Sequence, residues 1–343
     1  MNATLQCFCH IRKFVNFFKY HQQAIDFARE DKNKLSSSFK LLMEKLWPND
    51  YDIFSNNNPN KYFAPEEFKN KISKMNPLFQ GFAAYDAKNL VFFIIMTLHK
   101  ELNKGNKNNN INNNININQT NPQIFFNSFV QNFMLENKSI ISDLFFGINC
   151  SITQCHGCGT QTNNYQTYFS IVFPLEEVLK FKHNNNQFNF IYNNNNCVTI
   201  FDCFDYDKKI VNMSGINSMY CNYCKRNCDT SIYTVLTTGP EVLILFLDKE
   251  KGNEFNMKII FFEQLNLFNY IQNNNTGFNY KLIGVIINIG ESGMGGHFIA
   301  YCSDLLFGGW YKYDDANVTL VTDFQNEAIN YFIPSLLFYQ KTN

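Results

Sequence analysis

Hydrophobic residues in the N-terminal part of the chain recur at the three- and four-residue spacing of helices. This spacing favours amphipathic helices that each bury one face. The segment 82–102 is the most apolar of them, and Asp86 stands near its start. A carboxylate is favoured there because the N-terminal end of a helix dipole is positive. We predict a mostly helical first block from segment 82–102 and from Leu5, Cys9, Ile11, Val15, Phe39, Leu41, Leu42 and Leu46.

The pattern changes after residue 123, where short segments rich in β-branched and aromatic residues lie between turn residues. Segments of this length and composition are typical of strands in an antiparallel sheet. Helices followed by strands, without regular alternation, favour an α+β fold class. The predicted strands are 168–173, 197–204, 231–237, 241–247, 257–262, 280–289 and 296–302.

Asparagine runs separate the predicted elements. Asparagine favours turns and packs poorly in a core, so these runs predict solvated insertions. The longest, 104–123, joins the helical block to the strand-rich block.

The composition excludes several classes of protein. The 343 residues include 29 basic and 29 acidic ones, so no net charge draws the chain to nucleic acid or anionic membranes. Aromatic residues make up 17% of the chain, which is far too many for a disordered protein. The longest apolar run, around Leu90, is too short to cross a bilayer, and the N-terminal segment lacks the apolar core of a signal peptide. We therefore expect a soluble monomer of the cytoplasm or nucleus, with neither membrane nor nucleic acid among its partners.

Eleven cysteines cannot all pair in disulfides, because their number is odd. Cys155 and Cys158 form one CxxC pair, and Cys221 and Cys224 form a second. Two such pairs supply the four thiolates of a tetrahedral structural zinc site, each pair from a tight turn. The alternatives are buried free thiols or a site that has lost its metal. Two further cysteines lie close in the sequence and could be alternate ligands: Cys150 and Cys228.

His297 follows a glycine-rich segment and precedes a strand predicted over 298–302. A second short strand, 310–313, returns and brings Asp314 to the same end. We expect Asp314 to accept a hydrogen bond from Nδ1–H of His297, which would leave Nε2 to take a proton from a nucleophile. The alternative is that His297 is a structural histidine beside a strand.

Several segments resemble motifs of the ubiquitin-specific protease family of cysteine deubiquitinases, and together they cover nearly the whole chain. GGHFIAYC followed by WYKYDDANV resembles the family's histidine box, and MNATLQCF resembles the continuation of its cysteine box. The other similarities are those of ISDLFFG, CHGC and CNYC to the fingers, of GFAAYDAKNLVFFIIMTLHKELN to a central helix, and of TGPEVLILFLDKEKGNEF to a palm strand.

The resemblance implies a papain-like fold whose thumb, palm and fingers grip ubiquitin. It implies cleavage of ubiquitin–protein conjugates after the C-terminal Gly-Gly of ubiquitin, with ubiquitin and ubiquitinated proteins as partners and Zn²⁺ as a structural cofactor. One catalytic domain would then span 1–343. Its parts would be a helical thumb at 1–140, zinc-binding fingers at 141–235 and a palm at 236–343.

The resemblance also assigns roles to individual residues. It makes His297 the general base and Asp314 its orienting partner. Asp86 matches the carboxylate that holds the cationic tail of ubiquitin, and Gly295 and Gly296 would line the narrow channel for that tail.

The sequence departs from the family pattern where it begins. The family has its nucleophilic cysteine and one aromatic residue directly before the Met-Asn that matches Met1 and Asn2, with the oxyanion-hole asparagine further upstream. Cys7 and Cys9 cannot replace that cysteine, because they lie roughly 12–15 Å further along the predicted helix. We therefore expect the chain as printed to be inactive. Either a longer sequence carries the missing residues, or the protein is a ubiquitin-binding pseudoenzyme; zero net charge disfavours a third alternative, a zinc module for nucleic acid.

Overall fold

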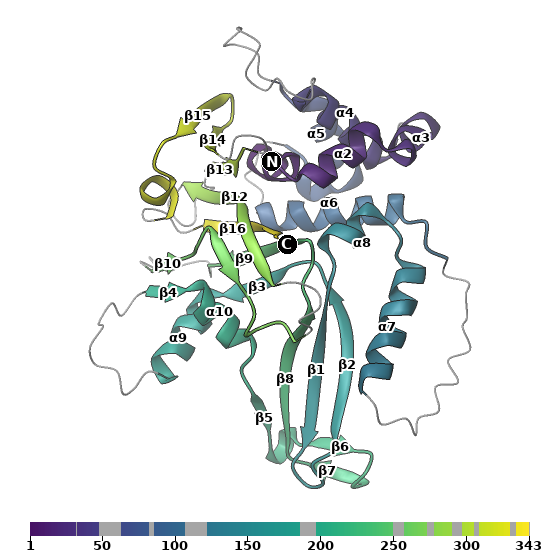
Figure 1. Ribbon diagram of the computed structural model, residues 1–343, viewed down its shortest axis with the longest axis vertical. Coiled ribbons are helices and arrows are strands. Elements are labelled where there is room, and N and C mark those ends of the chain that lie inside the picture. The colour runs from purple at the N-terminus through teal and green to yellow at the C-terminus, as the bar shows by residue number, and fades with distance from the viewer. Residues whose placement is uncertain are drawn as a thin grey trace.

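The computed structural model describes residues 1–31, 33–47, 63–81, 86–106, 122–185, 197–249, 257–272, 278–289, 297–304, 309–329 and 334–342. Figure 1 shows a helical part, a central sheet and a second sheet of long strands stacked along the longest axis, with a small hairpin at the far tip. Helices thus come first in the chain, and mainly antiparallel strands follow. This arrangement confirms the predicted α+β fold class.

The N-terminal helices cover one face of the central sheet (Figure 1). The fully buried ring of Phe8 contacts the rings of Phe14, Phe39, Phe145 and Phe338, with centroid distances of 5.8 to 6.3 Å. Each buried ring contributes about 2–3 kcal/mol to the stability of this core. These helices are α1 (Asn2–Cys9), α2 (Arg12–Tyr20), α3 (Gln22–Glu30), α4 (Leu35–Leu46), α5 (Glu66–Met75), α6 (Ala87–Leu102) and α8 (Ile140–Phe145), with the 3₁₀ turn η1 (Pro77–Phe79). Helix α7 (Pro122–Glu136) lies instead beside strand β2 (Gln161–Tyr168) (Figure 1).

Helix α6 confirms the prediction made from its apolar segment. It begins at Ala87, and Asp86 is its N-cap, because the Asp86 carboxylate accepts the backbone N–H of Lys88 at 2.9 Å. Ile94 and Ile95 are fully buried near its middle. Within the described ranges, no helix has both the length and the hydropathy needed to cross a membrane.

The central sheet has eight strands in the order β15-β14-β13-β12-β16-β9-β3, with β11 beside β12. Its neighbours are antiparallel except β3 and β9. Residues of β12 alternate between two cores, since Ile286 packs toward the helices while Val285 and Ile287 pack on the opposite face. The strands are β3 (Ile171–Pro174), β9 (Val242–Asp248), β11 (Gln264–Asn266), β12 (Asn279–Ile289), β13 (His297–Ser303), β14 (Trp310–Asp314), β15 (Asn317–Val321) and β16 (Pro334–Lys341).

A second group of elements covers the other face of the sheet. Phe204 is buried there and contacts the ring of Phe173 at 5.1 Å, which joins a helix to strand β3. This group contains α9 (Leu175–Asn185), α10 (Ile200–Asp207), the parallel pair β4 (Cys197–Thr199) and β10 (Lys258–Ile260), and the π-helical turn η4 (Gln325–Ile329).

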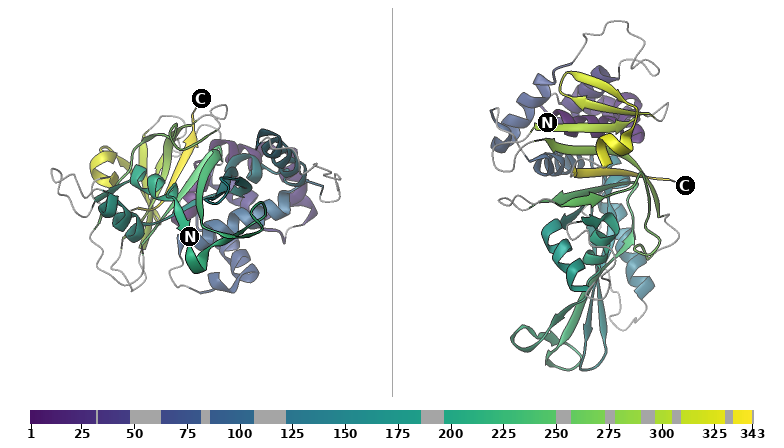
Figure 2. Two further views of the ribbon diagram at one scale, coloured as in Figure 1. Left: turned by 90° about the horizontal axis from the view of Figure 1, so that it is seen from below. Right: turned by 90° about the vertical axis from the view of Figure 1, so that its left-hand side faces the viewer.

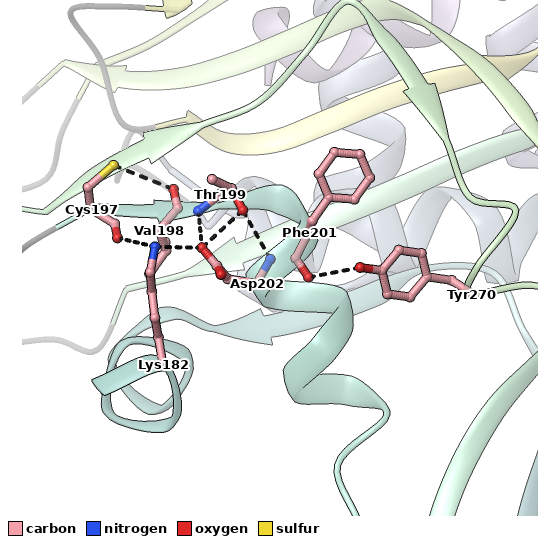
Figure 3. A network of polar contacts seen from close by, with 7 residues as sticks. All are labelled: Lys182, Cys197, Val198, Thr199, Phe201, Asp202 and Tyr270. Atoms are coloured by element: carbon pink, nitrogen blue, oxygen red, sulfur yellow. Dashed lines mark hydrogen bonds and ion pairs between the residues drawn. The ribbon is translucent and has the colours of Figure 1, made fainter. Parts of the chain in front are cut away.

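The prediction of a single strand over 197–204 is wrong beyond Thr199, where helix α10 begins. Thr199 and Asp202 form a capping box (Figure 3): the Thr199 hydroxyl accepts the N–H of Asp202 at 3.1 Å, and the Asp202 carboxylate accepts the N–H of Thr199 at 2.7 Å. Lys182 donates to the same carboxylate at 2.8 Å. These local bonds start a helix in a segment whose β-branched residues alone favour a strand.

The fingers are a second, four-stranded sheet of order β2-β1-β8-β5 that extends away from the central sheet (Figure 1; Figure 2, right). Strand β2 was not predicted, because its residues are nearly all polar and exposed and show no hydrophobic alternation. A two-stranded hairpin closes the tip. The elements are β1 (Gly147–Cys155), β2 (Gln161–Tyr168), β5 (Val211–Met213), β8 (Thr230–Thr238), and at the tip β6 (Met219–Cys221), β7 (Arg226–Cys228) and the 3₁₀ turn η2 (Gly215–Asn217).

Candidate functional site

His297 and Asp314 meet at the end of two adjacent strands. His297 is the first residue of β13, Asp314 is the last of β14, and the antiparallel register pairs Ala300 with Tyr313. Because side chains alternate along a strand, this register places His297 and Asp314 on the same face as diagonal neighbours. Their side chains are in contact, with 2.6 Å between Nε2 of His297 and Oδ1 of Asp314.

The ring nitrogen that contacts Asp314 is Nε2, whereas the sequence analysis expected Nδ1. The predicted partner, Asp314, is therefore confirmed by the geometry, and the predicted ring nitrogen is not. A nitrogen facing a carboxylate carries the proton, so Nε2–H donates to Asp314. Nδ1 is then the nitrogen left to accept a proton from another group.

Charged and polar groups surround this pair. Asp315 has a carboxylate oxygen 4.0 Å from Nε2 of His297, and the ammonium of Lys312 lies 3.8 Å from the Asp314 carboxylate. The side chain of Asn2 donates to the backbone oxygen of Asp315 at 3.0 Å. This bond holds the start of helix α1 against the turn that carries the two aspartates, so the first residues of the chain lie beside the His297–Asp314 pair.

A buried histidine, His10, links helix α1 to strand β14. This link was not predicted from the sequence. His10 is 3% exposed, and its Nδ1 lies 2.7 Å from the backbone oxygen of Gln6 while its Nε2 lies 3.0 Å from the hydroxyl of Tyr313. A carbonyl only accepts, so Nδ1–H donates to Gln6, and Nε2 accepts from Tyr313. Burial lowers the pKa of His10 to about 4, and burial raises the pKa of Tyr313, so both groups are neutral near pH 7.

No pattern in the sequence indicates the contact of His10 with Tyr313. His10 stands among apolar residues directly after helix α1, and its partner lies 303 positions away. Tyr313 is next to Asp314 and pairs with Ala300 in the strand that begins at His297. His10 therefore fixes the position of the strand that carries Asp314.

The other residues predicted to bind the substrate are Asp86, Gly295 and Gly296. Asp86 is exposed at the N-terminus of α6, and one of its oxygens accepts the N–H of Lys88. The ammonium of Lys88 also lies 3.3 Å from the Asp248 carboxylate at the end of β9. Gly295 and Gly296 lie outside the described residues.

The two CxxC pairs meet at the tip of the fingers, at the opposite end of the molecule from strands β13 and β14 (Figure 1). The sulfur atoms of Cys155, Cys158, Cys221 and Cys224 all lie within 4.8 Å of one another. The closest approaches are 3.7 Å between Cys158 and Cys221 and 4.0 Å between Cys155 and Cys224. Sulfur atoms at these separations fit the four corners of a tetrahedral metal site, so this cluster could hold a metal ion.

Both knuckles have the same backbone geometry. The N–H of Gly159 donates to the carbonyl of Cys155 at 2.9 Å, and the N–H of Lys225 donates to the carbonyl of Cys221 at 2.8 Å. Gly159 and Lys225 each stand four positions after the first cysteine, with φ of 73° and 57°. The left-handed conformation suits the glycine and strains the lysine. Each turn presents its two sulfur atoms to the opposite knuckle.

The thiols of the cluster differ in acidity. Hydrogen bonds from the hydroxyl and the backbone N–H of Thr160 lower the pKa of Cys158 to about 6. The pKa of Cys224 is raised, mainly by a hydrogen bond with Cys158 and to a smaller extent by burial. Thiolates packed this closely repel one another, so a bound cation would favour the loss of the remaining protons.

Comparison with known proteins identifies the family. A family model described as ubiquitin carboxyl-terminal hydrolase matches residues 1–339. This chain belongs to the ubiquitin carboxyl-terminal hydrolase family. The resemblance to ubiquitin-specific proteases, predicted from the motifs, is confirmed by this match and by the relatives and solved structures described next.

Relatives in the family are distant but align along the whole chain. Usp2 of Drosophila melanogaster is 22% identical over 353 residues, which cover 100% of this chain and 34% of that protein. Human ubiquitin carboxyl-terminal hydrolase 2 is 22% identical over 352 residues, 99% of this chain and 53% of the relative. The chain thus spans about a third to a half of the length of these curated relatives.

Solved structures of ubiquitin hydrolases share the fold. The SAGA DUB module Ubp8/Sgf11/Sus1/Sgf73 bound to monoubiquitin contains a chain that matches with a TM-score of 0.71 at 19% identity, over 100% of this chain and 66% of that chain. The same module bound to ubiquitin aldehyde matches with a TM-score of 0.69 at 20% identity, over 100% and 67%. The fold of this family member is therefore that of a ubiquitin-specific protease catalytic domain.

Proposed function

We propose that this chain forms the catalytic domain of a cysteine deubiquitinase, which removes ubiquitin from protein conjugates by cleaving after its C-terminal Gly-Gly. The observation that carries the proposal is the 2.6 Å contact of His297 with Asp314 at the strand ends beside the start of helix α1. Family membership supports the reaction class, and solved relatives of the same fold are bound to monoubiquitin and to ubiquitin aldehyde.

The orientation of His297 supports its role as the general base. With Nε2–H donating to Asp314, the free Nδ1 takes the proton of a cysteine thiol, and the thiolate attacks the carbonyl carbon of the ubiquitin C-terminus. The same nitrogen then gives the proton to the departing lysine amine. Asp314 holds the ring in this tautomer and stabilises its protonated form.

We propose that the nucleophilic cysteine precedes Met1 in the full-length protein. Helix α1 supports this placement, because the side chain of Asn2 is bonded to the turn next to His297. The first cysteines of the printed chain do not offer a thiolate, since Cys7 and Cys9 are 1% and 0% exposed. Burial also raises the pKa of Cys9, which leaves its thiol protonated and unreactive.

The remaining roles follow from the same resemblance. Asp86 would use its exposed carboxylate to hold the cationic tail of ubiquitin, at the end of α6 where Lys88 already fixes one oxygen. Cys155, Cys158, Cys221 and Cys224 would hold a structural Zn²⁺. Four thiolates fill the coordination sphere, so the metal would stabilise the fingers and leave no position for catalysis.

The second candidate is an inactive ubiquitin-binding scaffold on the same fold. The burial of Cys7 and Cys9 favours it for the chain as printed, because neither thiol is available to His297. Both candidates bind ubiquitin, and only the first turns it over.

Turnover by the full-length transcript product distinguishes them. The substrate is ubiquitin with a fluorophore on its C-terminal carboxyl group. We expect hydrolysis, and we expect His297→Ala to lower kcat by about 10²- to 10⁴-fold. Asp323→Asn is the matched control, because this exposed carboxylate accepts from Asn326 and not from His297, and it should change kcat far less. Ubiquitin binding without hydrolysis in the full-length protein would favour the scaffold.

A further inference from the structure

The cysteine cluster at the fingertip, which we propose as a metal site, contains a fifth cysteine. Cys228 is 7% exposed and packs in one cluster with the four cysteines of the two knuckles. Cys150 was the other alternate ligand considered from the sequence, but it lies in the middle of β1 and pairs with Tyr165 and Val235. The structure therefore separates two cysteines that the sequence could not distinguish.

The hairpin register directs Cys228 toward the metal cluster. Strands β6 and β7 pair Met219 with Cys228 and Cys221 with Arg226. Paired residues share a face and so do residues two apart, which puts Cys221 and Cys228 on the same face of the hairpin as diagonal neighbours. Cys221 faces the first knuckle, and Cys228 faces it too.

The position of the Cys228 sulfur is defined by Gly157 in the first knuckle. A Cβ atom placed on Gly157 would lie 3.3 Å from Sγ of Cys228, 3.4 Å from Sγ of Cys224 and 3.6 Å from Sγ of Cys155. Three sulfur atoms thus surround one point where the chain has no side chain. The Cys228 sulfur lies next to two of the four proposed ligands.

Backbone contacts hold Cys228 in this place. The N–H of His156, inside the first knuckle, donates to the carbonyl of Asp229, the residue after Cys228, at 2.9 Å. The thiol of Cys228 makes a long contact of 3.7 Å with the carbonyl of Arg226 and a hydrogen bond with the thiol of Cys224. These backbone contacts keep the Cys228 sulfur beside the cysteines of the two knuckles.

We propose that Cys228 is a reserve sulfur donor that takes the place of Cys224 at the metal site. A tetrahedral site uses four thiolates, so the fifth stays outside while the two knuckles are intact. Cys224 is half-buried, and its sulfur lies beside that of Cys228 at Gly157. When Cys224 is lost, Cys228 completes a set with Cys155, Cys158 and Cys221. This inference rests on the proposed zinc site and extends it.

The test counts the sulfur ligands of zinc by X-ray absorption spectroscopy in the purified chain and in Cys→Ser variants. We expect four sulfur ligands in the wild type, in Cys228→Ser and in Cys224→Ser, and three in the double variant Cys224→Ser/Cys228→Ser. Competition with a zinc chelator should show a loss of affinity of less than about tenfold for Cys224→Ser and more than about 100-fold for the double variant. The matched control, Cys224→Ser/Cys150→Ser, should behave as Cys224→Ser alone.

The other possible results would contradict either the reserve role of Cys228 or the metal site itself. Three sulfur ligands in Cys224→Ser, or equal zinc affinity with and without Cys228 in that background, would overturn the reserve role. So would failure of Cys224→Ser to fold in excess Zn²⁺ when Cys228→Ser and Cys150→Ser fold normally. A lost sulfur ligand in Cys228→Ser alone would make Cys228 a primary ligand instead. Absence of zinc from the wild type would defeat the metal site itself, which is a separate outcome.

Discussion

The cysteine cluster and the His297–Asp314 pair lie at opposite ends of the molecule and differ in how complete they are (Figure 1). The cluster brings together all the ligands that a structural metal requires, from two knuckles with matching backbone bonds. In the proposed function, the pair supplies a general base and its orienting carboxylate. The proposed metal site can therefore be recognised by counting its sulfur donors. The proposed catalytic site also depends on a nucleophile, which we place next to the start of helix α1.

Loss of the first knuckle should have the largest effect and should stay at the fingertip. In Cys155→Ser/Cys158→Ser only three cysteines of the cluster remain. We expect the zinc content to fall from about one per chain to near zero, because the site can no longer reach four thiolates. The hairpin should then open, and trypsin should cleave after Lys225 and Arg226, as mass spectrometry would detect. Unchanged zinc content would contradict the assignment of these ligands.

Protonation of His10 should weaken the region around the His297–Asp314 pair. Folding lowers the pKa of His10 from 6.5 to about 4, so the unfolded chain binds more protons between these values. Stability is therefore full above about pH 6.5 and falls as the pH drops toward 4, by up to about 3 kcal/mol. The hydrogen bond to Gln6 and the neighbouring Asp304 carboxylate oppose the shift, and the pKa of about 4 already includes both.

Urea unfolding of the wild type and of His10→Gln between pH 4.5 and 7.5 measures this effect. Glutamine does not titrate, so the variant should lose the part of the pH dependence that His10 causes. Partial desolvation raises the pKa values of the carboxyl groups of Asp143 and Asp207, which acts in the opposite sense, and these contributions cancel in the comparison. Identical pH dependence in both proteins would show that His10 is not the titrating group.

Removing the partner of His10 should have a smaller cost. Tyr313→Phe leaves Nε2 of His10 buried without a donor, which should reduce the free energy of unfolding by about 1–3 kcal/mol. Zinc affinity should not change, because the fingertip is remote. The exposed Tyr220 on the fingertip gives the matched control, and Tyr220→Phe should change stability by less than about 0.5 kcal/mol. A loss of zinc in Tyr313→Phe would contradict the independence of the two regions.

The smallest effects should come from the two left-handed residues of the knuckles. Lys225→Gly should stabilise the fingers by up to about 1 kcal/mol, because glycine adopts a φ of 57° without strain. Gly159→Ala should destabilise the fingers by about 1 kcal/mol. The added Cβ atom has free space, so the cost comes from the left-handed backbone, which alanine adopts with strain. Thermal unfolding of the zinc-loaded protein should show shifts of opposite sign.

Much of the fold could be predicted because it depends on local patterns. The apolar period of segment 82–102 predicted helix α6, and Asp86 is its cap. The CxxC pairs predicted the cysteine cluster, since ligand spacing within a knuckle is local. Strand β2 escaped prediction because its exposed residues carry no hydrophobic alternation, and α10 escaped because the capping box of Thr199 and Asp202 outweighs β propensity.

The site was harder to predict than the fold because it depends on long-range geometry. Sequence motifs placed His297 and Asp314 on neighbouring strands, but which ring nitrogen contacts Asp314 depends on the orientation of the ring, which no motif contains. The bond from His10 to Tyr313 joins residues 303 positions apart. The separation of Cys228 from Cys150 likewise follows from hairpin pairing rather than from distance along the chain.

The most direct test of the proposed function is the reaction of the full-length protein with ubiquitin that carries a thiol-reactive electrophile at its C-terminus. Mass spectrometry of the digested adduct identifies the modified residue. We expect one adduct, on a cysteine upstream of Met1, and no adduct on the chain that starts at Met1. No adduct on the full-length protein, or an adduct on one of the eleven cysteines of the printed sequence, would contradict it.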